Sequence, residues 1–203
     1  MKNMAVLSVA FLLIGSSVKS VMSQESIAGL YATGVYDSGQ VLPSGTVDPH
    51  YNLVGPASPA LAIDKNSRWV SPPAGSTWIG PSQGDEYDPV GVYVYTLTFD
   101  LTGQDISSAM IWGQWTADNY ASVLLNGIDT GVSVGDRDYG SLFDFEIDSG
   151  FVGGVNELQF VVNNSPPGDN PTGLLVAELE GVTYPPVLTE VSTWSQIKSL
   201  YAK

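Results

Sequence analysis

Apolar and polar side chains alternate along the centre of the chain, between Gly91 and Gly127. Every second residue is apolar or small in three successive segments, which is the period of a β-strand with one buried face. The positions expected to face the core are Tyr93, Tyr95, Leu97, Phe99, Leu101, Ala109, Ile111, Gly113, Trp115, Ala117, Ala121, Val123 and Leu125. The last segment ends in Asn126-Gly127, a dipeptide that tolerates the positive φ angles of a tight hairpin turn. This stretch therefore predicts β-strands joined by short turns.

Shorter alternating stretches flank this centre on both sides. They predict strands at residues 28–36, 50–54, 142–147, 156–163 and 172–184. Residues 55–90 are rich in Pro, Gly and Ser and have little periodicity, so loops and short edge strands are expected there. Pro185-Pro186 ends the last strand, because proline cannot donate to a β-ladder. We expect residues 24–186 to form one all-β domain, a two-sheet antiparallel β-sandwich of the jelly-roll type.

The first 23 residues have the features of a secretory signal peptide. Lys2 gives a positive start, and residues 5–14 form an apolar run that is too short to span a bilayer. Small or tolerated residues precede a cut expected after Ser23. A short N-terminal membrane anchor is the alternative. The leader predicts a protein that is secreted or held at the cell surface, with the periplasm as a further location.

The last 17 residues, 187–203, differ from the rest of the chain. Trp194, Ile197 and Tyr201 recur at helical spacing, and Ser192 or Thr193 can cap the start of a helix. We expect a short C-terminal helix here. It either docks on the sandwich or serves as a recognition tail for a protein partner.

The chain is strongly acidic, with 21 Asp and Glu against 7 Lys and Arg and a net charge of −14. Loss of the leader would remove Lys2 and Lys19 but no acid, and would leave a net charge of about −16. Nucleic acids and anionic membrane surfaces are bound through Lys and Arg, so we expect neither as a partner. An acidic surface suits a soluble exported protein or one that gathers cations.

The residues that most catalytic chemistries require are missing or isolated. His50 is the one histidine of the chain, and no Gly-x-Ser-x-Gly elbow is present. The chain has no cysteine, which excludes disulfides and thiolate chemistry. Two carboxylates could form a glycosidase pair, but among 21 acids a pair within reach is expected by chance. We therefore expect no enzyme activity.

Several short motifs occur along the chain in an order that resembles the order found in a known family. They are Tyr93, Tyr95, Phe99-Asp100-Leu101, Ala117-Asp118-Asn119, Val123, Leu125-Asn126-Gly127, Phe143, Phe145, Gly154, Asn156, Leu158, Phe160, Val162 and Asn163. Residues 28–184 resemble a galactose-binding-like jelly roll, an outline also found in the non-catalytic sugar-binding domain of some large glycoside hydrolases. The segment Asp48-Pro49-His50-Tyr51 is similar to one in uncharacterised secreted bacterial modules. The resemblance implies a secreted, non-catalytic module that binds a carbohydrate, a glycan or a cell-surface polymer.

Sugar binding requires aromatic faces for C–H patches and fixed polar groups for hydroxyls. Tyr87 lies in the long loop region, and Tyr120 follows a predicted strand end. The candidate ligand-binding residues are Trp69, Trp78, Trp112, Trp115, Asp118 and Asn119. For each tryptophan the alternative is packing in the core. For Asp118 and Asn119 the alternative is hydrogen bonding that ties down a turn.

A structural calcium ion is a further candidate, because related jelly rolls often hold one and because Ca²⁺ takes carboxylate and carbonyl oxygens from loops. The candidate groups are Asp85, Glu86 and Asp88; Asp136 and Asp138; and Glu178 and Glu180. None of them follows a complete calcium-loop pattern, so the sequence assigns no ligands. No other cofactor is expected.

A second functional class stays open, namely a structural or interaction β-sandwich displayed on the cell surface or in an extracellular matrix. An exposed Trp or Tyr beside Asp118 and Asn119 in a groove favours glycan binding. Buried tryptophans together with an exposed apolar edge or tail favour the interaction protein.

Overall fold

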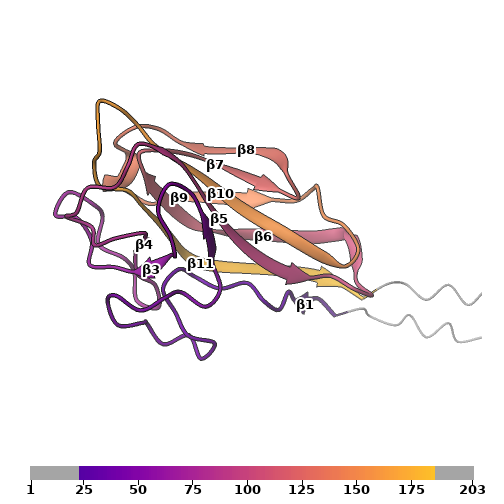
Figure 1. Ribbon diagram of the computed structural model, residues 1–203. Coiled ribbons are helices and arrows are strands. Elements are labelled where there is room, and N and C mark those ends of the chain that lie inside the picture. The colour runs from indigo at the N-terminus through magenta and orange to yellow at the C-terminus, as the bar shows by residue number, and fades with distance from the viewer. Residues whose placement is uncertain (1–22, 186–203) are drawn as a thin grey trace, which may run out of the picture.

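The computed structural model describes residues 23–185, which form an all-β protein. Its strands pair antiparallel in two sheets that pack against each other (Figure 1). The predicted two-sheet antiparallel β-sandwich is thereby confirmed. Residues 1–22 and 186–203, which hold the expected leader and the expected C-terminal helix, lie outside the described residues. Within the described part of the chain, no helix is long and apolar enough to cross a membrane.

The first sheet is built around its two longest strands, which are neighbours. Its order is β3 (Leu61–Ala62), β4 (Ile79–Gly80), β11 (Gly173–Tyr184), β6 (Asp105–Asp118) and β9 (Phe143–Ile147), and β1 (Glu25–Ser26) also pairs with β11. The short strands β3 and β4 fall within residues 55–90, as the sequence predicts.

The second sheet faces the first and contains the rest of the central alternating stretch. Its order is β2 (Asn52–Val54), β5 (Gly91–Asp100), β10 (Val155–Asn164), β7 (Tyr120–Leu125) and β8 (Ile128–Val134). A short 3-10 helix, η1 (Asp138–Gly140), lies between β8 and β9. Strands β5 and β10 pair along their whole lengths, from Gly91 opposite Asn164 to Asp100 opposite Val155.

The main core lies between the two sheets and includes the positions that the alternation in the central stretch predicts. All thirteen of these positions are buried. Trp115 is at the centre of an aromatic cluster, with its ring 5.5 Å from that of Phe160 and 6.4 Å from that of Phe145. Because Phe160 belongs to the second sheet, this cluster connects the two sheets.

A smaller core lies on the other face of the first sheet. The rings of Trp69 and Trp78 are tilted by 30° with centroids 4.3 Å apart, and they pack with Ile63 and Leu175. The indole N–H of Trp78 donates to the carbonyl of Val70 at 3.0 Å. The loops between β2 and β5 are therefore anchored to the sheet through two tryptophans.

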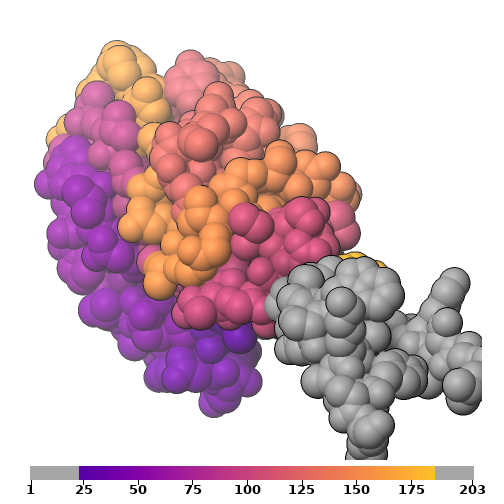
Figure 2. Space-filling model, turned by 90° about the vertical axis from the view of Figure 1, so that its right-hand side faces the viewer, coloured from indigo at the N-terminus to yellow at the C-terminus, as the bar shows by residue number. Residues whose placement is uncertain are grey.

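The strand predicted at residues 28–36 is wrong, because the structure has turns there and only a single bridge, between Val35 and Val41. Gly29 and Gly34 adopt φ angles of 89° and 68°, which interrupt an extended strand. The segment is still fixed to β11, since the Thr33 N–H donates to the Val176 carbonyl at 3.0 Å. Figure 2 shows the N-terminal part of the described chain (indigo to magenta) along one side of the molecule.

The predicted tight hairpin between β7 and β8 is confirmed. Asn126 and Gly127 have φ angles of 54° and 76°. The Asn126 side chain also donates to the carbonyl of Gly150 and to Oδ1 of Asn156, both at 2.9 Å. The turn is thus stabilised both by its backbone conformation and by the side-chain hydrogen bonds of Asn126.

We expect Gly127→Ala to lower the free energy of unfolding by about 1–2 kcal/mol, because an L side chain in the left-handed region clashes with its own backbone. Gly153→Ala is the matched control, since neither glycine has an atom within 4 Å of an added Cβ but only Gly127 has a positive φ. Urea unfolding of both variants measures the difference. Equal unfolding midpoints for the two variants would contradict the assigned turn.

Candidate functional site

The structure separates the six candidate binding residues into three groups. Trp78 and Trp115, with 0% and 1% of their surfaces exposed, belong to the two cores and line neither of the two cavities described below. Trp69, Asp118 and Asn119 meet at a cavity between loops. Trp112 lies in a different cavity, on the open face of the first sheet.

The first cavity, here called the loop-end cleft, has a volume of about 730 Å³. It is lined by residues 66–69, 85, 87, 118–120, 136–137, 139 and 165–171. These segments are the connections that follow β3, β4, β6, β8 and β10. In Figure 1 the start of β11 and the loop before it lie at the left end of the sandwich, opposite β1 and the end of β11.

Asp118 is the last residue of β6 and is held in a defined position. Its Oδ2 accepts a hydrogen bond from the Trp69 indole N–H at 2.7 Å, and its backbone carbonyl accepts one from the Thr172 hydroxyl at 2.6 Å. Gly173 leaves room for Trp69, since a Cβ at this glycine would lie 3.0 Å from the indole ring. Asp118 itself is only 6% exposed, and its Oδ1 has no hydrogen-bond partner among residues 23–185.

The pKa of Asp118 is raised from its ordinary value of 3.8 to about 6. Burial is the largest cause, since it disfavours the charged carboxylate, and the charge of Asp136 adds to it. The hydrogen bond from Trp69 and the positive charge of Arg68 act in the opposite direction. A carboxyl group with one unpartnered oxygen and a raised pKa at the wall of a cleft is a recognised mark of a functional site.

The asparagines of the cleft are engaged in holding the loops together. The Asn119 side chain donates to Oδ1 of Asp136 at 3.2 Å and accepts from the Ser165 N–H at 3.0 Å. The Asn170 amide donates to the carbonyls of Ser165 and Gly168 at 3.0 and 3.1 Å. The Asn119 side chain therefore stabilises the loops by hydrogen bonding, which is the alternative that the sequence analysis left open for this residue. It also lies in the lining of the cleft.

Two exposed tyrosines give the loop-end cleft its accessible aromatic surface. Tyr87, on the loop between β4 and β5, is 73% exposed, and Tyr120, at the start of β7, is 46% exposed. Both lie in segments that the sequence singles out for their aromatic residues. The sequence identifies both tyrosines but does not place them among the candidate ligand-binding residues.

Arg68 and Arg137 also line the cleft and were missed by sequence reasoning. Arg68 lies on the loop between β3 and β4, and Arg137 lies directly before η1. Neither residue belongs to a motif or to a periodic segment. Only their scarcity in an acidic chain could have drawn attention to them.

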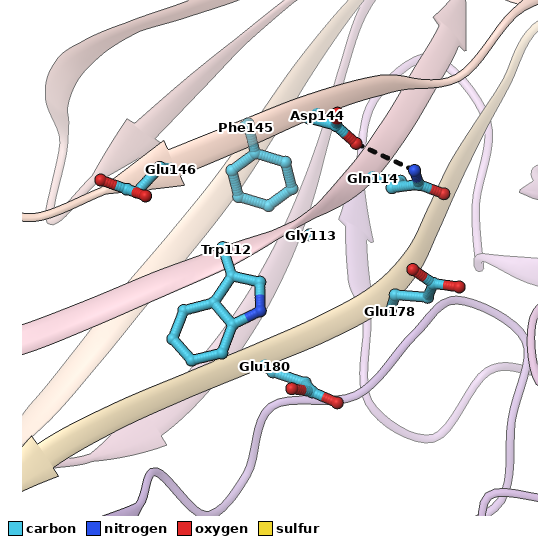
Figure 3. Close-up of a pocket in the computed structure, with 8 residues that line it drawn as sticks. All are labelled: Trp112, Gly113, Gln114, Asp144, Phe145, Glu146, Glu178 and Glu180. Atoms are coloured by element: carbon cyan, nitrogen blue, oxygen red, sulfur yellow. Dashed lines mark hydrogen bonds between the residues drawn. The ribbon is translucent and has the colours of Figure 1, made fainter. Parts of the chain in front are cut away.

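The second cavity, here called the sheet-face groove, measures about 650 Å³ and lies on the outer face of the first sheet (Figure 3). Trp112 of β6 lies opposite Glu146 of β9 on one side and Glu180 of β11 on the other. A bulge between Ala177 and Glu180 puts Glu178, with a φ of 50°, into the same lining. Figure 3 shows the Trp112 ring between the carboxylate side chains of these strands, and shows the Gln114 amide bonded to Asp144.

Two of the candidate calcium residues, Asp88 and Asp138, take part in local hydrogen bonds. Asp88 accepts a hydrogen bond from the Ser82 hydroxyl, and Asp138 accepts one from the Gly135 N–H at 2.6 Å. Within residues 23–185, no three His, Cys, Asp or Glu side chains are grouped so that they could hold a metal ion. The structural calcium ion stays a prediction without assigned ligands.

His50 lies outside both cavities. Its ring stacks on that of Tyr31 with centroids 3.6 Å apart, and its Nε2 lies 3.5 Å from Oδ1 of Asp37. The Asp48 side chain accepts from the N–H groups of His50 and Tyr51 at 2.8 and 3.0 Å, so the Asp48-Pro49-His50-Tyr51 segment forms a compact turn.

Neither the search against protein-family models nor the search of curated proteins finds a match to this chain. The class of protein is described by its fold and its cavities: it is an all-β sandwich with a polar cleft between its loops and an acidic groove on one sheet.

Proposed function

We propose that this protein is a secreted or cell-surface module that binds a glycan in the loop-end cleft without catalysing a reaction on it. The observation that carries the proposal is the pair of exposed tyrosines, Tyr87 and Tyr120, in the same cleft as the buried carboxylate of Asp118. Aromatic faces match the C–H patches of a sugar ring, and polar groups held in fixed positions match its hydroxyls. The resemblance to galactose-binding-like domains supports the same function.

The loops that form the cleft suit recognition, because a rigid scaffold positions them. Asp118 and Tyr120 are the end of one strand and the start of the next, in opposite sheets. The asparagine bonds described above connect the 118–120 turn to the 165–171 loop. A site preformed in this way loses little conformational entropy when a ligand binds.

The alternative proposal is an interaction protein, and the sheet-face groove is the observation that favours it. Trp112 lies there among Asp144, Glu146, Glu178 and Glu180, and neither Lys nor Arg is part of the lining. A basic surface of a protein partner would complement this groove in charge and could cover the tryptophan.

A glycan array on the full chain tests the two proposals against each other. Tyr87→Ala and Tyr120→Ala are each expected to weaken retention of the bound glycan by roughly threefold to tenfold, because each removes an aromatic contact. Tyr36→Ala is the control, since Tyr36 is an exposed tyrosine that lines neither cavity. All three substitutions are on the surface, so the stability of the protein should hardly change.

If glycan retention is lost on substitution of Trp112 but is unchanged by Tyr87→Ala and Tyr120→Ala, the binding site lies in the sheet-face groove instead. An array with no retained glycan, together with a basic protein captured only when Trp112 is present, would replace glycan binding by the interaction proposal.

A further inference from the structure

The basic residues in the described part of this acidic protein gather at the loop-end cleft. In residues 23–185, the Lys and Arg residues are Lys65, Arg68 and Arg137. Both arginines line the cleft, and Lys65 lies on the same loop as Arg68. A chain with a net charge of −14 thus presents its described positive charges at the same end of the sandwich.

The two arginines come from segments that are bonded to each other. The Val70 N–H donates to the Tyr139 carbonyl at 2.8 Å, and each arginine lies two residues before one member of this pair. Both arginines therefore come from neighbouring segments of the lining of the cleft.

Both guanidinium groups have free donors. Arg68 forms no ion pair and no side-chain hydrogen bond with any residue in 23–185. Arg137 has one distant pair, in which its Nε lies 3.9 Å from Oδ2 of Asp136, and its side chain is 82% exposed. Each guanidinium carries five N–H donors in a planar fork that matches a carboxylate.

All four aspartates in the cleft accept a hydrogen bond, and three of them, Asp85, Asp136 and Asp169, are exposed. Asp85 accepts from the Asn66 amide at 3.1 Å, Asp136 from the Asn119 amide at 3.2 Å, and Asp169 from the Val90 N–H at 3.4 Å. Asp118 differs, since it is buried and its Oδ1 has no partner in the described chain. The cleft thus offers two cationic donors and a buried acceptor in its wall.

We propose that the ligand of the loop-end cleft is an acidic saccharide, a glycan in which a uronic acid unit places its carboxylate at Arg68 and Arg137 and a ring hydroxyl toward Asp118. This inference rests on the proposed glycan-binding function and names its substrate class. A neutral glycan would leave Arg68 without a charged acceptor among residues 23–185 and Arg137 with only its distant pair to Asp136. The cleft itself also holds Asp85, Asp118, Asp136 and Asp169, so the acidic preference comes from direct contact between the anion and the two guanidinium groups. Acids elsewhere on the protein oppose an anion weakly, because at physiological salt the Debye length is about 8 Å.

The test measures binding of matched oligosaccharides to the full chain by calorimetry at physiological salt. The probes are oligomers of glucuronate, galacturonate, mannuronate and guluronate, each beside its carboxyl-reduced neutral counterpart. We expect at least one acidic oligomer to bind about tenfold or more tightly than its neutral counterpart, the effect of a hydrogen bond between charged groups. Arg68→Gln and Arg137→Gln should each remove most of this preference for the acidic oligomer over its neutral counterpart.

Lys65→Gln is the matched control, because it removes the same charge from the same loop at a residue outside the lining of the cleft. This variant should keep the acidic preference. Equal affinities for acidic and neutral oligomers, or a preference that survives both arginine substitutions, would overturn the acidic-saccharide inference and leave the proposed function standing. If neither these oligomers nor the glycans of the array bind, the proposed function itself fails together with the inference.

Discussion

Trp115→Ala is expected to lower the free energy of unfolding by about 3–5 kcal/mol, the usual cost of truncating a large aromatic side chain in a core. Trp115 is 1% exposed and packs against Phe145 of its own sheet and Phe160 of the other sheet. The substitution removes dispersion contacts in both sheets and leaves a cavity that a rigid sandwich closes only in part. Urea unfolding followed by far-UV circular dichroism measures the loss.

Trp112→Ala is the control for this prediction. Trp112 lies three residues earlier on β6 but faces the sheet-face groove, so its removal should cost clearly less stability. If the two variants unfold at the same urea concentration, the two faces of β6 are assigned incorrectly.

The second large effect is the pH dependence of stability that Asp118 introduces. Its pKa is about 6 in the folded protein against an ordinary value of 3.8, so the folded state binds more protons than the unfolded state between these values. The stabilising contribution is therefore fully present below about pH 4 and is lost as the pH rises through about 6. The size of the loss is roughly 2–3 kcal/mol, from a shift of about two pKa units.

Asp118→Asn isolates this contribution, because the asparagine keeps the shape and the acceptor for the Trp69 indole but does not titrate. Relative to this variant, the natural protein should lose stability between pH 4 and pH 6 and show a constant difference above pH 7. Asp148→Asn, on the surface, controls for the change in net charge. A stability difference between the natural protein and Asp118→Asn that does not vary with pH would show that Asp118 is not buried as described.

The sequence predicts the strands of the sandwich well because alternation determines which side of a strand is buried. Trp112 and Trp115 illustrate this: they are three residues apart, so they lie on opposite faces of β6, and only Trp115 belongs to the core. The Asn126-Gly127 turn is equally local, since its φ angles follow from the two residues themselves. The strand prediction for residues 28–36 is wrong because hydrogen bonds of Thr33 to Val176 and Thr77 outweigh the local preference of this segment for a strand.

The site is less predictable than the fold because it is assembled from loops that have no period. The sequence places Asp118 and Asn119 at a strand end, where a sandwich presents its loops. It cannot show that Trp69 reaches across to Asp118, because that contact joins residues 49 positions apart. The positions of Arg68 and Arg137 depend on the Val70–Tyr139 backbone bond, which likewise exists only in the folded chain.

The most direct test of glycan binding in the loop-end cleft is an NMR titration of the full chain that follows the indole N–H signals of its tryptophans. The Trp69 indole donates to Asp118 at the wall of the cleft, whereas Trp112 lies in the sheet-face groove. Addition of an oligosaccharide retained on the array should shift the Trp69 signal and leave the Trp112 signal in place. A titration in which the saccharide shifts Trp112 alone, or shifts no indole signal at concentrations that saturate binding, would contradict the assignment of the loop-end cleft as the binding site.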